Sequence, residues 1–330
     1  MQTIAEIEPY TRFIGRTALL KGGALTLDWS LSGISFVADF SDAKCTLYVR
    51  SGYKQRIAVE IDGEITERPL VNEGAESIEF SVPLGIHAVR LLKDTEVSVK
   101  GLCSELLGIE FRGHFLEKPE EQKLRMEIIG DSIASGLGVL GVYQQGKDWS
   151  FEDHSAVHSF AYLVPKALQA EAIVISKGGV GTIKDSAGKN MPDLYPYLAG
   201  YRDTETLLDF SENKTDLVLF ELSGNDLRYS DEELKESYLA FLHKLRSVHG
   251  PEKPIVWVGK SPRIEAIVRS VKEKEQDSHL FLCQFSYGGS GSAALVTQTS
   301  GHPNVKEQAE LADAIVTFLM EHHLTGKAEN

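Results

Sequence analysis

Four features carry the chemistry that this sequence suggests, and each follows an apolar run or precedes a helical pattern. They are Ser132, the glycine-rich loop Ser176–Gly181, Asn225 and His302. A serine can supply a nucleophile and a histidine a general base, while a backbone N–H group and a side-chain amide can stabilise an oxyanion. Singly, each residue has an ordinary explanation as part of a turn or a helix cap. Together, and in this order, they predict acyl transfer with Ser132 as nucleophile and His302 as base.

The elements that must position these residues alternate between strand and helix patterns. Short apolar runs predict strands at 124–129, 172–175, 217–222, 255–258 and 280–285, and helical periodicity predicts helices at 155–169, 231–248, 265–275 and 305–323. Such alternation is typical of a mostly parallel sheet with helices on both faces. Because ligands bind at the carboxyl ends of such strands, we expect these four features to share that edge. Ser132 should also lie at a helix N-terminus, whose free N–H groups suit an oxyanion.

The first ~115 residues show a period of two instead, which indicates strands with one buried face. Alternating runs occur at 34–40, 45–49, 57–61, 77–82, 87–92 and 97–102, and Asp62-Gly63 supplies a turn signal. Many short strands at such spacing predict an all-β jelly roll or β-sandwich. The stretch Arg112–Lys123 is polar and contains a proline. We therefore predict a β domain at 1–118 and an α/β domain at 119–330.

Composition excludes several classes of protein. The 330 residues include 34 Lys+Arg and 48 Asp+Glu, a net charge of −14, which argues against a nucleic-acid partner. No run approaches the roughly 18 apolar residues of a membrane span. Residues 1–6 contain neither the basic nor the apolar region of a secretion signal, and three cysteines suit a reducing compartment. We therefore expect a cytoplasmic protein without a membrane or nucleic-acid partner.

Three further patterns imitate cofactor and metal sites. Gly136–Gly141 matches the string of a dinucleotide fingerprint but starts too far beyond the preceding strand. Gly141–Lys147 imitates a P-loop but is followed by Asp148, where magnesium binding needs Ser or Thr. His154 and His158 lack a third ligand at metal spacing. We therefore predict neither a metal nor an organic cofactor.

The chemistry-bearing motifs resemble the blocks of the SGNH (GDSL-like) hydrolases. Gly130-Asp131-Ser132, Gly179, Gly224-Asn225-Asp226 and His302-Pro303 stand where that superfamily has its four blocks. The resemblance implies a three-layer α/β domain with a flavodoxin-like parallel sheet. It also assigns roles to residues: Ser132 and His302 are catalytic, Ser132, Gly179 and Asn225 form the oxyanion hole, and Asp131, Gly224 and Asp226 support them.

Three additional patterns resemble carbohydrate esterase family two over nearly the whole chain. They are Ile14–Thr17, Gly85–Leu91 and Met191–Pro196. Members of that family carry an N-terminal jelly roll before the SGNH domain and remove acetyl groups from plant polysaccharides. The resemblance implies a cofactor-free acetyl esterase whose substrates are acetylated oligosaccharides or polysaccharides, such as xylan or mannan fragments.

Two departures from the family pattern concern the base and the sugar site. Thr299 and Ser300 stand where SGNH enzymes usually have an Asp, and Gly301 replaces a Trp that often lines the sugar site. The resemblance to dyad members of the family implies a Ser132–His302 pair, with a backbone carbonyl orienting the histidine. The alternative is an acid from elsewhere, with Asp226, Asp153 and Glu152 as candidates.

Two alternative functions stay open at this stage. The first is an SGNH esterase or lipase that acts on small acyl or lipid esters. The second is a carbohydrate-binding protein whose hydrolase domain is weakened by the missing acid. The sequence also leaves the sugar, the acetylated position and the oligomeric state open.

Overall fold

The structure is a computed structural model that describes residues 1–96, 103–141, 150–184, 188–199, 206–212, 215–222, 224–259, 261–285 and 302–326. Contacts divide the chain into a β unit, Met1–Glu121 with Tyr197–Thr206, and an α/β unit, Gln122–Pro196 with Leu207–Asn330. The division therefore falls after Glu121, whereas we predicted it after Lys118. The return of a later segment to the β unit has no counterpart in the sequence prediction.

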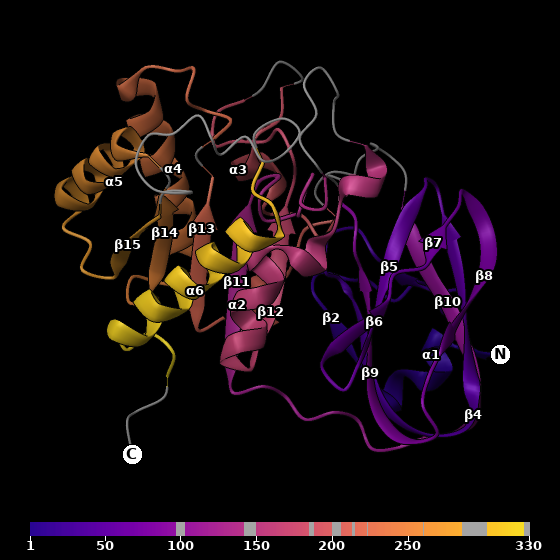
Figure 1. Cartoon of the computed structure of the whole chain (residues 1–330). Helices are drawn as coiled ribbons and strands as arrows, with labels where there is room; N and C mark the ends of the chain where they lie inside the picture. Colours follow the sequence, from indigo (N-terminus) through magenta and orange to yellow (C-terminus); the bar gives the residue numbers. More distant parts are fainter. Residues whose placement is uncertain are drawn as a thin grey trace. The chain divides into compact units, whose positions relative to one another are not determined.

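The β unit is a curled antiparallel sheet built around one long strand, β4 (Gly33–Ser51) (Figure 1). Strand β10 (Ser104–Phe115) pairs with both halves of β4, while β9 (Gly85–Lys93) pairs with the first half and β8 (Gly74–Ser81) with the second. The sequence predicts two separate strands, 34–40 and 45–49, which is wrong because both belong to β4. Strand β10 pairs with β4 on both sides of residues 41–44, through an irregularity between Phe111 and Gly113.

The remaining elements of this unit are short. They are β1 (Gln2–Thr3), α1 (Ile4–Ile7), the 3₁₀ helix Glu8–Tyr10, β2 (Thr11–Ile14), β3 (Leu25–Thr26), β5 (Gln55–Ile61), β6 (Glu64–Glu67) and β7 (Leu70–Val71). Asp62 and Gly63, with φ of 51° and 86°, form the predicted turn between β5 and β6. The jelly-roll arrangement stays a prediction, and the predicted strand at 97–102 lies outside the described residues.

A segment from the second half of the chain is tied to the β unit by two buried side chains. The Arg16 guanidinium donates to the carbonyl of Tyr197 at 3.1 Å, and the Trp29 indole N–H donates to the carbonyl of Leu198 at 2.8 Å. Both donors are almost fully buried. Because buried donors need acceptors, these bonds explain why Tyr197–Thr206 belongs to the β unit.

The α/β unit contains a five-stranded parallel sheet in the order β12, β11, β13, β14, β15. These strands are β12 (Ala170–Ser176), β11 (Leu124–Gly130), β13 (Leu217–Glu221), β14 (Ile255–Gly259) and β15 (Leu280–Gln284). Strand β11, the first of this sheet in sequence, lies between the second and the third, which is the flavodoxin-like order. The predicted parallel sheet is therefore confirmed.

Helices cover both faces of this sheet, because right-handed crossovers on opposite sides of β11 place their helices on opposite faces. The helices are α2 (Phe160–Leu168), α3 (Met191–Leu194), α4 (Asp231–His249), α5 (Pro262–Glu275) and α6 (Val305–Glu321). Helix α6 packs beside α2, and α4 beside α5 (Figure 1). Helix α2 begins later than predicted because Ala156–His158 form a separate 3₁₀ turn before it.

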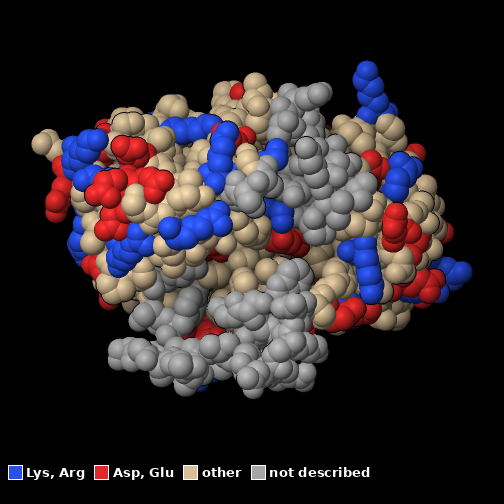
Figure 2. All heavy atoms as spheres, turned by 90° about the horizontal axis from the view of Figure 1, so that it is seen from above, with Lys and Arg blue, Asp and Glu red and all other residues tan. Residues whose placement is uncertain are grey.

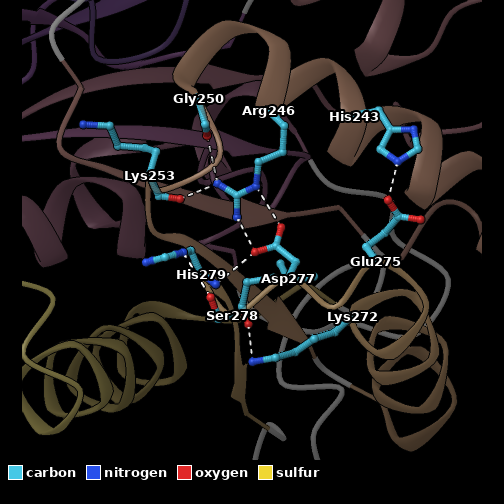
Figure 3. Close-up of polar contacts among 10 residues, drawn as sticks. His243, Arg246, Gly250, Lys253, Lys272, Glu275, Asp277, Ser278 and His279 are labelled. Atoms are coloured by element: carbon cyan, nitrogen blue, oxygen red, sulfur yellow. Dashed lines mark hydrogen bonds and ion pairs between the residues drawn. The ribbon is translucent and has the colours of Figure 1, made fainter.

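An arginine fixes the amino edge of the sheet on the α4–α5 side. The Arg246 guanidinium, near the end of α4, holds Asp277 through bonds of 2.8 and 3.1 Å (Figure 3). It also donates to the carbonyl of Gly250 at 3.3 Å and to that of Lys253. Because Asp277 lies in the turn between α5 and β15, the Arg246 side chain joins α4, the loop before β14 and this turn.

Acidic and basic side chains are interspersed on the face seen in Figure 2. The chain carries a net charge of −14, and the absence of a nucleic-acid partner stays a prediction. Among the helices that the structure describes, none has the length and apolar character needed to cross a membrane.

Candidate active site

Ser132 and His302 are in hydrogen-bond contact at the carboxyl edge of the parallel sheet. Ser132 follows β11, and its Oγ lies 2.7 Å from Nε2 of His302, which precedes α6. Helix α6 starts with a capping box in which Asn304 accepts from the N–H of Glu307 at 2.9 Å, as the sequence suggests. The side chain of Ser132 is largely buried, with 6% of the residue exposed. Two residues far apart in sequence thus form a nucleophile–base contact.

The backbone after Ser132 differs from the prediction, because residues 131–140 form turns and no helix begins there. Gly136 and Gly138 have φ of 70° and 71°, which interrupt a right-handed helix. Gly136 also packs tightly, since a Cβ built on it would lie 2.0 Å from the carbonyl oxygen of Ser155. The N–H groups near Ser132 are therefore supplied by turns, with the Leu137 N–H bonded to the Ser132 carbonyl at 2.9 Å.

Asp131 and Asn225 join the ends of three strands. Asp131 accepts from the N–H of Ile133 through Oδ1 at 3.0 Å and from the amide of Asn225 through Oδ2 at 3.1 Å. The same Asn225 nitrogen donates to the carbonyl of Val180 at 3.2 Å. These bonds hold the turns after β11, β12 and β13 together, as expected from the meeting of strand ends at one edge.

Asp226 anchors the glycine-rich loop after β12. Its carboxylate accepts from the N–H and hydroxyl of Thr182 at 2.6 and 2.9 Å and from the N–H of Ile183 at 3.4 Å. Burial raises the pKa of the Asp226 carboxyl, although these hydrogen bonds act in the opposite direction. Gly181 packs directly against this carboxylate, since a Cβ on Gly181 would lie 2.0 Å from Oδ1 of Asp226.

Gly179 occupies the same loop in a conformation that favours glycine. Its φ is 77°, and no atom lies within 4 Å of a Cβ built on it. The loop is held from both sides, because Asn190 donates to the Thr182 carbonyl at 3.1 Å. Sequence reasoning missed Thr182 and Asn190, since neither belongs to a recognisable motif.

The remaining predicted positions are distributed as follows. Gly224 is described and precedes Asn225, whereas Thr299, Ser300 and Gly301 lie outside the described residues. Asp153, a candidate distant acid, accepts from the N–H and hydroxyl of Ser150 at 2.6 and 3.0 Å and thereby caps a 3₁₀ turn. The carboxylate of Asp226 is likewise occupied, because it accepts from Thr182 of the loop after β12. Within the described residues, no cluster of three His, Cys, Asp or Glu could hold a metal ion.

A flavodoxin-like sheet with a serine and a histidine in contact at its carboxyl edge has the features of an SGNH-type hydrolase. The chain is 24% identical to the acetylxylan esterase/glucomannan deacetylase of Cellvibrio japonicus over 338 residues, which cover 97% of this chain and 90% of that protein. No family model matches the chain. The resemblance predicted from the sequence is confirmed, and ester hydrolysis is the activity that this relative's name gives.

Solved structures share the fold over nearly the whole chain. An acetyl xylan esterase from the rumen bacterium Butyrivibrio proteoclasticus has a TM-score of 0.85 and 20% identity, with 99% of each chain covered. A family two carbohydrate esterase from Clostridium thermocellum, in complex with cellohexaose, has a TM-score of 0.84 and 20% identity and covers 96% of this chain and 99% of its own. These likenesses establish the fold.

Proposed function

We propose that this protein is a serine esterase that removes O-acetyl groups from carbohydrate. The observation that carries the proposal is the 2.7 Å contact between Ser132 Oγ and His302 Nε2. This separation lies within the range at which a general base can take a proton from a nucleophile. The substrate class rests on the similarity to the acetylxylan esterase/glucomannan deacetylase over 97% of the chain.

The proposed reaction proceeds in two halves. Ser132 Oγ attacks the acetyl carbonyl carbon while His302 Nε2 takes the hydroxyl proton, and the sugar oxygen leaves with that proton. Water then attacks the acetyl-serine, again giving a proton to His302, and acetate leaves as the serine regains its hydrogen. The N–H groups of Ser132 and Gly179 and the amide of Asn225 stabilise the oxyanion in both halves.

We further propose that Ser132 and His302 act as a dyad. Neither Thr299 nor Ser300 is an acid. The carboxylate of Asp226 is bonded to Thr182 and that of Asp153 to Ser150 in its own turn, which supports the proposal. The third member of a triad fixes the tautomer of the histidine and stabilises its charged form, and a backbone carbonyl can do the first of these.

The test is mass spectrometry of acetylated xylo- and manno-oligosaccharides before and after incubation with the protein. Loss of acetyl groups with wild type, and none with Ser132→Ala, supports a carbohydrate deacetylase. Hydrolysis of octanoyl esters in preference to acetyl esters would identify the lipid-esterase alternative instead. Binding of the sugars without turnover would identify the carbohydrate-binding alternative.

A further inference from the structure

One buried side chain, Gln308, connects the helix that follows His302 to the turn that contains Ser132. Gln308 lies in the first turn of α6 and is 1% exposed. Its Nε2 donates to the carbonyl of Ile133 at 2.9 Å, and its Oε1 accepts from the N–H of Phe160 at 2.8 Å. A single amide thus bonds three segments: α6, the turn after β11 and the start of α2.

Both partners of Gln308 are backbone groups, and the Ile133 carbonyl also accepts from the N–H of Gly136 at 3.2 Å within the turn. The N–H of Phe160 is the first of α2, and a helix provides no internal acceptor for it. Ser159, the N-cap residue, makes no side-chain capping bond to this helix, and its hydroxyl donates to the Ala156 carbonyl at 2.7 Å. Because an amide presents one acceptor and one donor end, bonding both ends fixes the orientation of Gln308.

Short and constrained lengths of chain connect Gln308 to the two reacting groups. Ile133 is the residue after Ser132. On the other side, Pro303 is buried between His302 and the capping box that starts α6. The bond from Gln308 to Ile133 therefore joins the segment that carries Ser132 to the segment that carries His302.

We propose that Gln308 is a positioning residue that fixes the separation between Ser132 Oγ and His302 Nε2. The proposal rests on the proposed function, because it matters only if these atoms exchange a proton. Proton transfer requires a separation of about 2.6–3.2 Å. A displacement of about 1 Å can lower a rate by about 10²-fold, even when it arises away from the reacting atoms.

The test compares two variants with a matched control. Gln308→Met keeps the length of the side chain and loses both bonds. Gln308→Glu keeps an acceptor for the N–H of Phe160 but replaces the donor to the Ile133 carbonyl with an anionic oxygen, which the carbonyl oxygen repels. The control, Arg246→Met, also removes a side chain that joins several elements, but at the amino edge of the sheet (Figure 3). Each protein is assayed for kcat, KM, melting temperature and the rate of Ser132 labelling by a fluorophosphonate.

We expect both Gln308 variants to lower kcat and the labelling rate in parallel, by about 10- to 10²-fold, with KM changed by less than about threefold. Arg246→Met should lower the melting temperature by at least as much while its kcat stays within about twofold of wild type. A folded Gln308 variant whose kcat and labelling rate stay within twofold of wild type would overturn the proposal, and if Gln308→Met does not fold, Gln308→Glu decides. A wild type without turnover or labelling would instead refute the proposed function.

Discussion

The side-chain amide of Asn225 donates to Oδ2 of Asp131 at 3.1 Å. A second bond, to the Val180 carbonyl at 3.2 Å, engages the same nitrogen. An asparagine amide has two N–H groups, so both have acceptors in the protein. If Asn225 donates to an oxyanion, the developing negative charge must compete with one of these acceptors, and the neutral carbonyl of Val180 is the weaker of the two.

The first prediction is that Asn225→Ala lowers kcat by about 10²–10³-fold, the usual cost of losing one oxyanion donor. KM should change less than kcat, because the charge that Asn225 stabilises develops only in the transition state. Steady-state kinetics with p-nitrophenyl acetate measures both constants. The comparison is Asn190→Ala, which loses the hydrogen bond that the Asn190 amide donates to the neighbouring Thr182 carbonyl. Its kcat should fall by less than about tenfold. A raised KM with unchanged kcat in Asn225→Ala would assign Asn225 to substrate binding or to structure.

The second prediction concerns two glycines of the loop after β12. Gly181→Ala places a methyl group against the buried carboxylate of Asp226, and such overpacking costs about 1–3 kcal/mol. Gly179→Ala meets open space and incurs only the strain of a positive φ, about 1–2 kcal/mol. Urea denaturation of both variants should find Gly181→Ala the less stable. The reverse order would mean that Asp226 yields readily and does not anchor the loop.

The sequence allows the edge of the α/β sheet to be predicted because parallel strands bring their carboxyl ends together. That rule places Ser132 after β11 and Asn225 after β13 without any knowledge of their contacts. The cap of α6 is predictable for a similar reason, since Asn304 and Glu307 form a local pattern that needs no tertiary information. Both predictions depend on short-range chemistry or on a general rule of topology.

Contacts between distant segments could not be predicted in this way. Tyr195 donates to the carboxylate of Glu127 at 2.7 Å, and Nε2 of His249 lies 2.9 Å from the same oxygen, in the interior of the α/β unit. These residues come from three separate elements and follow no motif. The turns after Ser132 escaped prediction because a helix usually follows a strand in this kind of sheet, and the positive φ of Gly136 and Gly138 that interrupts a helix is visible only in the structure.

The third prediction is a pH-dependent stability of Asp226→Asn. Burial raises the pKa of the Asp226 carboxyl in the folded protein above its unfolded value. The folded state therefore binds this proton more tightly, so the contribution to stability is present below the unfolded pKa and is lost as pH rises through the folded pKa. Asn cannot titrate, so the stability that Asp226→Asn loses relative to wild type should be larger at pH 4 than at pH 7.

Thermal melts of both proteins across this pH range measure the difference. A loss that grows toward neutral pH would contradict the raised pKa. Activity gives a separate result: we expect Asp226→Asn to lose about tenfold or less, because the amide oxygen can still accept from the loop. A loss of more than about a hundredfold in the folded variant would make Asp226 the acid partner of His302.

The fourth prediction tests the dyad through the positions where an acid is missing. Thr299→Ala and Ser300→Ala should each keep activity within about tenfold of wild type, whereas His302→Ala should lose nearly as much as Ser132→Ala, because paired catalytic residues act as a unit. Since His302 must be neutral to accept a proton, kcat/KM should rise with pH through its titration and then level off. A large loss in Thr299→Ala or Ser300→Ala would show that one of these side chains orients the histidine.

The fifth prediction concerns the nucleophile, on which the whole account depends. Intact-mass analysis after reaction with a serine-directed fluorophosphonate, followed by peptide mapping, should find one adduct on wild type, located on Ser132. Ser132→Ala should form no adduct and lose about 10⁴-fold or more in kcat while remaining folded. An adduct on another serine, or near-normal turnover by Ser132→Ala, would contradict the assignment of Ser132 and His302 as the reacting pair.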